Sequence, residues 1–331
     1  MISFVWAAGT PMLAGTGGSE TYTSGHAREL IRRGIKTQIV MVGNYKKEGR
    51  HDFSDIPFLN LEKPEDIRKI PGMIVFVNKP YFVVTKKKSA VILHCATPDV
   101  NEKQEYIDGV KDKIIIATSI YSGQQWALYL GIPYSHIHIV LPFADPIFGT
   151  GKRSKGVKKS RIVFAGRLHP DKGVYTLLET MHKLEHHKNT QSVTIVAAGM
   201  HTETGVTIHR MLNNYPYAQL ISAQKTVESM ARVLSSNDIL LMPSVFAEPF
   251  GMLSVEAQHT GCRVVASNIG GLPETNCGLL TLVEPRNPDA LIRGINQAVA
   301  LGSATKKERE IAKSYFTLKS SVDSLLQVLR I

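Results

Sequence analysis

The chain has 331 residues, of which 43% are hydrophobic, so it is long enough for two domains that each bury a core. No run of eighteen apolar residues occurs, which argues against a membrane-spanning helix, and the first residues lack the basic stretch of a signal peptide. With 39 Lys and Arg against 28 Asp and Glu, the net charge is +11. This balance suits phosphate-bearing ligands, nucleic acid or an anionic membrane surface, but no nucleic-acid motif is present, so no nucleic-acid partner is expected.

The three cysteines, Cys95, Cys262 and Cys277, are too few and too far apart in sequence for a disulfide framework or a zinc site. Each lies in or beside an apolar stretch, where a free thiol behaves as a small hydrophobic side chain. We therefore expect a cytoplasmic protein that holds no structural metal.

Along the first half of the chain, short apolar runs rich in Val and Ile alternate with helical patterns. The first run, Ile2–Ala7, leads into a glycine loop and then into a helix over Ser19–Arg33. Five more strands are predicted here, at Lys36–Val42, Met73–Val77, Ala90–His94, Ile114–Thr118 and His138–Leu141.

Residues 149–160 are rich in Gly, Ser and Lys and contain almost no apolar side chain, so we predict an interdomain linker there. Beyond it, six strands are predicted at Arg161–Phe164, Val193–Ala197, Gln219–Ile221, Ile239–Met242, Arg263–Ala266 and Leu279–Val283. Helical periodicity is found at Tyr175–His186, Val227–Ser235, Ser254–Thr260, Lys306–Phe316 and Leu318–Arg330. The last of these helices is a candidate to pack back against the first domain.

Alternation of this kind predicts an α/β fold with parallel sheets covered by helices on both faces. We expect two Rossmann-like, doubly wound domains, residues 1–148 and 161–331, that face each other across a cleft. In such sheets ligands bind at the carboxyl ends of the strands.

The segment from Leu241 to Ala257 follows one buried strand and opens a helix. Glu248 is expected on the loop between them and Glu256 inside the helix. The glycine between the two acids lets backbone approach a ligand, and the free N–H groups of the first helical turn can bind an anion. Two carboxylates beside such an anion site could hold hydroxyl groups on either side of a phosphate, although an ordinary helix start with two surface acids has the same spacing.

A second candidate site follows the first strand of the second half, over residues 164–174. Arg167 could grip a diphosphate as a bidentate fork, and Lys172 could do so as a point charge. Two solvated basic residues are the simpler alternative, but it weakens where the loop lies at the carboxyl end of a strand.

The strings GRLHPDKG, PSVFAEPFGMLSVEA and ASNIGGLPE, in this order, closely resemble family 4 glycosyltransferases, which have the GT-B fold. The match covers nearly all of the second domain. In that family the paired acids form an E-x7-E motif, which maps onto Glu248 and Glu256. The resemblance implies that Glu248 contacts the hydroxyls of the donor sugar and Glu256 those of the ribose, while Arg167 and Lys172 neutralise the leaving pyrophosphate. It also implies that the sugar and phosphate are held by the backbone N–H groups of Phe250, Gly251, Met252 and Leu253.

The first domain matches the family less fully. Its glycine loop, with Gly17 and Gly18 before the first helix, resembles the GGxE loop that approaches the donor phosphate or the acceptor. His94 ends a strand where the family often places a histidine near the transferred sugar, although a lone histidine at such a position is more often structural. The turn at Leu141–Asp145 resembles the family's PNGVD turn, with Phe-Ala in place of the usual Asn-Gly.

The resemblance implies a retaining transferase that moves a hexose or N-acetylhexosamine from a nucleotide sugar, most commonly a UDP-sugar, to an acceptor hydroxyl. The tripeptide Asp-x-Asp, which binds the metal in metal-dependent transferases, does not occur. The charge on the leaving diphosphate would then be balanced by Arg167, Lys172 and a helix N-terminus, with no metal or other cofactor. Catalytic roles are expected for Glu248, His94, Arg167 and Lys172. The acceptor, the base and the sugar stay open.

Three other classes of protein are compared with this sequence pattern. An NAD-dependent oxidoreductase is disfavoured because the glycine loop lacks the G-x-G-x-x-G spacing and no acid ends the second predicted strand. A sugar-nucleotide epimerase on the same fold and a non-catalytic sugar-binding module both stay open. Finally, the basic run that begins at Lys79 and ends at Lys88 could touch anionic lipid, but a solvated face is the favoured interpretation.

Overall fold

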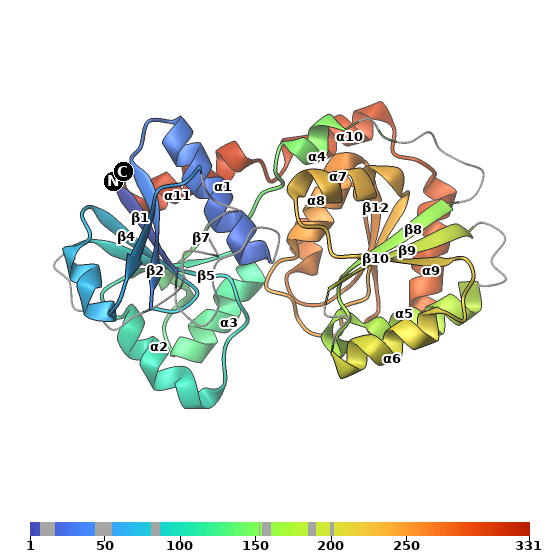
Figure 1. Ribbon diagram of the computed structural model, residues 1–331, viewed down its shortest axis with the longest axis horizontal. Helices are drawn as coiled ribbons and strands as arrows, with labels where there is room; N and C mark the ends of the chain where they lie inside the picture. Colours follow the sequence, from blue (N-terminus) through green and yellow to red (C-terminus); the bar gives the residue numbers. More distant parts are fainter. Residues whose placement is uncertain are drawn as a thin grey trace. The chain divides into compact units, whose positions relative to one another are not determined.

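The computed structural model describes residues 1–6, 17–43, 55–80, 87–151, 153, 160–184, 190–198 and 202–331. Within these residues the chain forms two compact units, shown in Figure 1. The first unit joins Met1–Phe143 with the carboxy-terminal Leu318–Ile331, and the second is Ala144–Thr317.

The first unit is built on a seven-stranded sheet in the order β3-β2-β1-β4-β5-β6-β7, and every strand pair is parallel. The order reverses between β1 and β4, as in doubly wound sheets. The strands are β1 (Ile2–Trp6), β2 (Thr37–Val42), β3 (Phe58–Leu61), β4 (Met73–Val77), β5 (Ser89–Leu93), β6 (Ile114–Ala117) and β7 (Ile137–Ile139). Strands β1, β4 and β5 are buried along their whole length, and β2 is buried at every residue except Gln38. This burial explains their continuous apolar runs.

Helices cover both faces of this sheet (Figure 1). One face packs against α1 (Gly18–Arg32) and α11 (Leu318–Leu329), which also contact each other. The opposite face packs against α2 (Lys103–Val110) and α3 (Ile120–Leu130), where Trp126 is fully buried in an aliphatic core. Short 3-10 turns lie at η2 (Pro64–Lys69), η3 (Val100–Glu102) and η4 (Tyr134–His136).

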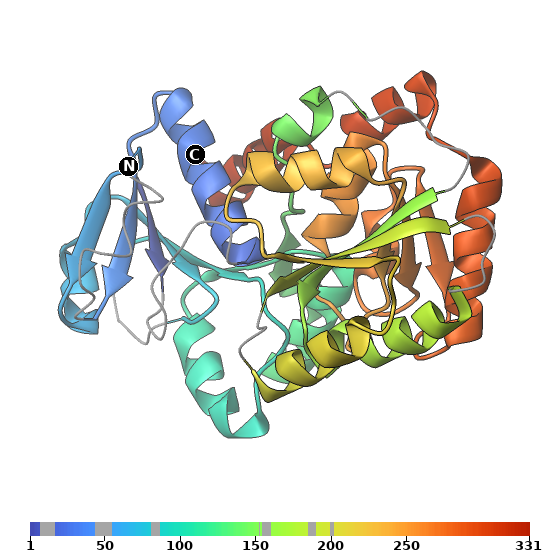
Figure 2. The same ribbon diagram turned by 45° about the vertical axis from the view of Figure 1, so that its right-hand side comes forward.

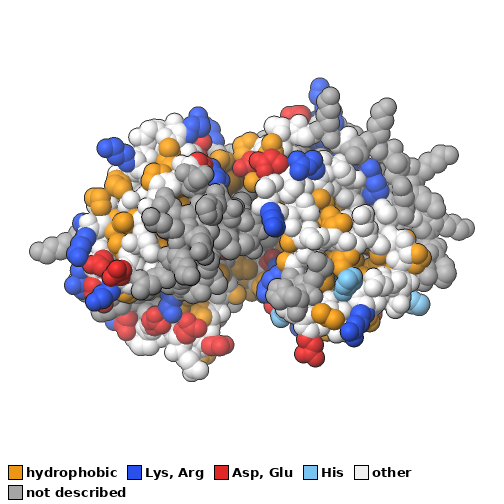
Figure 3. All heavy atoms as spheres, viewed as in Figure 1, with side chains coloured by type: hydrophobic (Ala, Val, Ile, Leu, Met, Phe, Trp, Pro, Cys, Tyr) orange, Lys and Arg blue, Asp and Glu red, His pale blue; other side chains and the backbone are white. Residues whose placement is uncertain are grey.

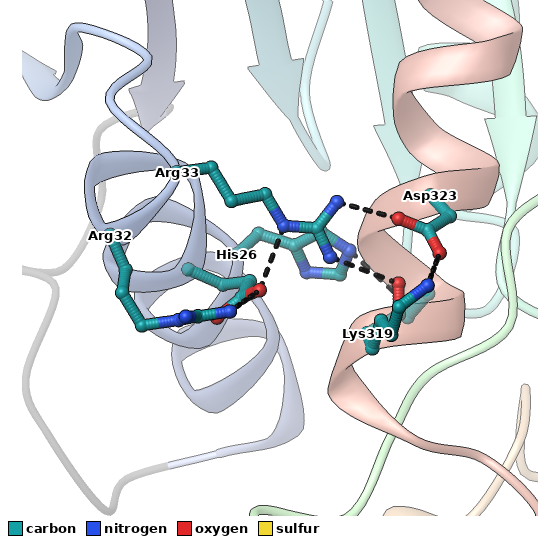
Figure 4. A network of polar contacts seen from close by, with 7 residues as sticks. His26, Arg32, Arg33, Lys319 and Asp323 are labelled. Carbon is teal, nitrogen blue, oxygen red and sulfur yellow. Dashed lines mark hydrogen bonds and ion pairs between the residues drawn. The ribbon is translucent and has the colours of Figure 1, made fainter.

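The carboxy-terminal helix α11 is tied to α1 by polar contacts between the two helices (Figure 4). Arg33 donates to Glu29 Oε1 at 2.7 Å and to Asp323 Oδ1 at 2.5 Å, so its guanidinium joins the two helices. Deeper in the interface, His26 Nε2 lies 3.1 Å from the hydroxyl of Ser321, which donates to the carbonyl of Leu141 at 2.5 Å. We call this set of contacts the α1–α11 clasp.

The second unit has a six-stranded, fully parallel sheet in the order β10-β9-β8-β11-β12-β13. Its strands are β8 (Ser160–Arg167), β9 (Thr190–Ala198), β10 (Ala218–Ser222), β11 (Ile239–Met242), β12 (Arg263–Ser267) and β13 (Leu280–Val283). Successive side chains alternate between two cores: Ile162 and Phe164 point to one, and Val163 points to the other.

Each core of the second unit is closed by its own set of helices (Figure 2). The first is covered by α5 (Val174–Leu184), α6 (Glu203–Leu212) and α9 (Pro288–Leu301). The other is covered by α4 (Ile147–Thr150), α7 (Val227–Ser236), α8 (Met252–Thr260) and α10 (Lys306–Ser314). Turns η5 (Pro170–Lys172) and η6 (Leu272–Thr275) lie between these elements.

The predicted fold class of two Rossmann-like α/β domains is confirmed, and all twelve predicted strands have a counterpart. Strand β3 was not predicted, because its sequence Phe-Leu-Asn-Leu is short and half exposed. The predicted linker 149–160 begins within α4 and ends within β8, and residues 152 and 154–159 lie outside the described residues. Helix α8 begins at Met252, two residues before the predicted start, because Gly251 is its N-cap. No helix among the described residues is long and apolar enough to cross a membrane.

Candidate active site

The loop that carries Arg167 and Lys172 is fixed by backbone contacts at the carboxyl end of β8. Arg167 is the last residue of the strand, and Lys172 ends the turn η5. Gly173 follows with φ of 71°, and a Cβ there would lie 1.8 Å from the carbonyl oxygen of Pro243. Only glycine permits so close an approach to the loop after β11. The carbonyl of Asp171 also accepts the N–H of Val245 at 2.8 Å, so the two loops are joined.

These contacts bring Lys172 and Glu248 together. Lys172 Nζ lies 2.9 Å from Glu248 Oε1, and the two side chains are 22% and 10% exposed. The buried hydroxyl of Ser244 donates to the same Oε1. The ammonium group also lies 4.9 Å from the ring centre of Phe246. Because Lys172 and Ser244 both contact Oε1, the second carboxylate oxygen of Glu248 is left for another partner.

Arg167 is less constrained than Lys172. Its side chain is 60% exposed, and the ion pair that it forms with Asp171 has a separation of 4.0 Å. The structure therefore places Arg167 on the same loop as Lys172 with its guanidinium open to solvent.

The start of α8 offers backbone donors beside this pair. Gly251 is the N-cap and makes no side-chain cap. Among the described residues, no hydrogen bond is made by the N–H groups of Phe250, Gly251, Met252 or Leu253. Free N–H groups at a helix N-terminus form an anion site, which is strengthened by the helix dipole.

The glycines of the loop 268–272 hold this segment from the other side. Gly271 donates its N–H to the carbonyl of Glu248 at 2.7 Å. Gly270 has φ of 62°, and a Cβ there would lie 2.6 Å from both the backbone nitrogen and the backbone oxygen of Glu248. The string ASNIGGLPE thus has a structural role, because its two glycines allow a close contact with the backbone of Glu248.

Glu256 lies in the second turn of α8 and is half-buried. No hydrogen bond or ion pair joins its side-chain carboxylate to another described residue. Burial raises the pKa of Glu256 to about 7, and the nearby carboxylate of Asp145 raises it further. A half-buried carboxyl with no partner is costly and is suited to receive hydrogen bonds from a ligand.

In the first unit, His94 directly follows β5. Its backbone N–H donates to Asn78 Oδ1 at 3.1 Å, while Asn78 Nδ2 lies 3.3 Å from the hydroxyl of Ser19 in the first turn of α1. Asn78 has φ of 65°, a left-handed conformation that asparagine tolerates better than most residues. This side chain therefore links the carboxyl ends of β4 and β5 to the helix that opens at Gly18.

The imidazole of His94 lies against aromatic rings. Tyr22 meets it edge-on with ring centres 4.4 Å apart, and His26 stacks on Tyr22 at 4.0 Å. Burial lowers the pKa of His94 to about 3, with a smaller contribution from His26. His94 is therefore neutral near pH 7, and its Nε2 is buried with no hydrogen-bond partner among the described residues.

The glycine loop and the basic run are only partly described. Gly17 is the N-cap of α1 without a side-chain cap, and Gly18 begins the helix, whereas Gly15 and Thr16 lie outside the described residues. In the basic run, residues 81–86 likewise lie outside them.

Two lysines at the end of that run have structural partners. Lys87 Nζ donates to the carbonyl of Ile70, and Lys88 Nζ donates to that of Leu329 at 2.7 Å, at the ends of η2 and α11. On the face drawn in Figure 3, Lys and Arg side chains are scattered among Asp and Glu. These two ammonium groups therefore have structural partners within the first unit.

The geometry of the second unit agrees with its similarity to known proteins. Residues 159–300 match the family model of glycosyl transferases group 1. A lipopolysaccharide 1,2-N-acetylglucosaminetransferase from Salmonella typhimurium is 28% identical over 179 residues, which are 50% of this chain and 46% of that protein. A D-inositol 3-phosphate glycosyltransferase from Mycobacterium ulcerans is 27% identical over 245 residues, 68% of this chain and 51% of the relative.

Solved structures show the same fold over the whole length. A glycosyltransferase from Rickettsia africae superposes with a TM-score of 0.81 at 18% identity and covers 99% of this chain and 97% of its own. The Anabaena protein HepE, solved in complex with UDP, has a TM-score of 0.79 at 16% identity, with 99% of both chains covered.

The fold is therefore that of the GT-B glycosyltransferases. Over residues 159–300 the chain is similar to the glycosyl transferases group 1 family. The chain spans about half the length of the curated relatives that it matches.

Sequence reasoning missed Ser244 and Asn78. Ser244 follows Pro243 at the end of β11, and its spacing of four from Glu248 gave a signal that could have been read as a side chain supporting the acid. Asn78 gave no such signal, because its partners, His94 and Ser19, are distant in sequence.

Proposed function

We propose that this protein is a retaining glycosyltransferase that moves a hexose or N-acetylhexosamine from a UDP-sugar to an acceptor hydroxyl without a metal ion. The observation that carries the proposal is the Lys172–Glu248 pair at 2.9 Å, held beside the uncapped N-terminus of α8. A cation, a carboxylate and free N–H groups at the carboxyl ends of parallel strands match a charged diphosphate joined to a polyhydroxyl sugar.

In this proposal the departing diphosphate is stabilised by Lys172, Arg167 and the N–H groups of residues 250–253. Negative charge builds on the phosphates as the bond to the sugar breaks, and donors already fixed in place cost no reorganisation at that moment. The free oxygen of Glu248 accepts a hydroxyl of the transferred sugar, and Glu256 accepts those of the ribose. HepE, which has the same fold, was solved in complex with UDP, and this favours a uridine nucleotide as the donor of this protein.

His94 is proposed to contribute a neutral imidazole on the side of the transferred sugar, as the family resemblance implies. Its pKa of about 3 excludes a cationic role at neutral pH. The unpaired Nε2 is the atom that a sugar hydroxyl or the acceptor would meet.

A screen of UDP-, GDP- and ADP-sugars by thermal shift would test the donor class, because a ligand that binds the native state raises its melting temperature. The best donor is then incubated with and without candidate sugar acceptors in the presence of EDTA. Transfer that proceeds in EDTA and retains the anomeric configuration of the sugar, as determined by NMR, supports the proposal. Free UDP together with an epimerised sugar would indicate an epimerase, and binding without any turnover would indicate a non-catalytic module.

A further inference from the structure

A buried polar cluster lies between α8 and η6, one turn beyond the proposed nucleotide-binding end. Ser254, Gln258 and Thr275 are each fully buried, and all three are joined by hydrogen bonds. The proposed mechanism gives none of these three side chains a role. Buried polar side chains are expensive unless their partners are complete, so their arrangement calls for a role.

Gln258 satisfies both ends of its side-chain amide. Its Oε1 accepts the backbone N–H groups of Cys277 at 2.8 Å and Leu279 at 3.1 Å. Its Nε2 donates to the carbonyl of Thr275 at 2.8 Å and lies 3.2 Å from the carbonyl of Ser254. One side chain of α8 therefore bonds the backbone of residues 275–279 at three points, while the carbonyl of Leu279 also accepts the N–H of Val264 at 2.9 Å.

The fixed segment continues directly into the proposed site. The hydroxyl of Thr275 lies 2.7 Å from both the carbonyl oxygen of Leu272, to which it donates its one proton, and Ser254 Oγ, from which it can accept. Leu272 in turn lies under the N-cap of α8, since a Cβ on Gly251 would be 2.6 Å from its Cδ2. The preceding glycines, Gly270 and Gly271, grip the backbone of Glu248.

We propose that Gln258 is a positioning residue that, given the proposed function, sets the geometry of the diphosphate and sugar sites through the loop 270–279. Gln258 touches no substrate atom. It holds the loop, and the loop contacts both the backbone of Glu248 and Gly251, the N-cap of α8. The part of the donor that depends on Gln258 is the diphosphate sugar, and the nucleoside is unaffected.

The first experiment needs no ligand and uses hydrogen–deuterium exchange on the whole protein. In Gln258→Met, which keeps the length of the side chain and removes its hydrogen bonds, exchange should rise about tenfold at Cys277 and Leu279. It should also rise at Gly271 and Ser254, whose N–H groups donate to the carbonyls of Glu248 and Gly251. The control is Thr180→Val, which removes a buried hydrogen bond of α5 on the opposite face of the sheet. Faster exchange at Cys277 and Leu279 with no change at Gly271 and Ser254 would overturn the proposal.

The second experiment compares ligands. For Gln258→Met, the affinity for the best UDP-sugar should fall about tenfold, whereas the affinity for uridine should change less than twofold. Equal losses for both ligands, or the same loss in Thr180→Val at matched stability, would show a merely structural role and overturn the proposal. If wild-type protein binds no nucleotide sugar, the proposed function fails, and the exchange result still decides the role of Gln258 in fixing the loop.

Gln258→Glu gives a readout that a steric role would not produce. Protonated, the new carboxyl keeps one donor for Thr275 and one acceptor for Cys277, but ionised it faces two carbonyls. The ratio of variant to wild-type UDP-sugar affinity should therefore recover as the pH falls from 8.5 to 5.5. A ratio that stays flat would contradict the hydrogen-bonding role.

Discussion

The carboxyl ends of the two sheets are organised in different ways. In the second unit, Lys172 and Glu248 lie in two short segments whose backbones are joined directly, at Gly173 against Pro243 and at Asp171 with Val245. In the first unit, His94 depends on Asn78 and Tyr22, which come from β4 and α1. A site built from two short loops can be recognised in the sequence as short motifs, whereas a site built from side chains that are distant in sequence cannot.

The two regions also differ in charge. The second unit combines a cation, a carboxylate and a helix N-terminus, so its electrostatics suit a diphosphate. Around His94 the groups are neutral, because burial lowers the pKa of His94 to about 3 and that of His26 to about 4. Under the proposed function, we expect the second unit to bind the donor and the first unit to contribute His94 to the reaction, and four experiments test this division.

The largest effect is expected for Lys172→Met. Loss of a fixed cation facing the leaving diphosphate should lower kcat/KM by about 10²- to 10³-fold. Steady-state transfer with the best UDP-sugar measures this. Lys183→Met is the matched control, since Lys183 on α5 forms an exposed ion pair with Asp289 of α9. Similar activity in the two variants would remove Lys172 from the mechanism.

His94→Ala should divide the two units functionally. We expect kcat to fall about 10²-fold, because a positioned imidazole is lost, while the UDP-sugar affinity changes less than threefold. Since the pKa of His94 is about 3, wild type and variant should keep parallel pH–rate profiles from pH 5 to 9. A variant that loses donor affinity and kcat together would contradict the division.

The same division explains what could be predicted from the sequence. All strands of the two sheets except β3 could be predicted, because buried parallel strands appear as short Val- and Ile-rich runs, whereas β3 is half exposed. Glu248 and Lys172 could also be predicted, since each lies in a contiguous string with its glycines. The pairing of Lys172 with Glu248 could not be predicted, because it depends on the approach of Gly173 to Pro243. The hydrogen bond between Asn78 and the backbone of His94 could not be predicted either.

The α1–α11 clasp should matter for the stability of the first unit alone. Arg33→Met breaks the contact with Asp323 and is expected to lower the free energy of unfolding by about 1 to 2 kcal/mol. Arg32→Met is the control, because Arg32 also pairs with Glu29 but is 73% exposed and does not reach α11. It should cost less than about 0.5 kcal/mol.

Tryptophan fluorescence in urea can follow this unit selectively, because the two tryptophans, Trp6 and Trp126, are both buried in it. Donor affinity should be unchanged in both variants. Equal destabilisation by Arg32→Met and Arg33→Met would mean that the contact to α11 contributes little and that only the pairs with Glu29 count.

The smallest effect concerns the pH dependence of donor binding through Glu256. Its pKa is raised to about 7, so in the free protein its contribution to stability is fully present below its usual value of 4.5 and is lost as the pH rises through 7. A ribose diol bonds best to the ionised carboxylate, so binding should tighten about tenfold between pH 6 and 8. Calorimetry with a UDP-sugar measures this without interference, since its phosphates do not titrate in that range.

Glu256→Gln should bind weakly and without the pH step. Asp145→Asn, which keeps an acceptor for the N–H of Ile147, removes the neighbouring negative charge and should move the step to lower pH. A step that persists in Glu256→Gln would assign the titration to another group and leave Glu256 outside the ribose site.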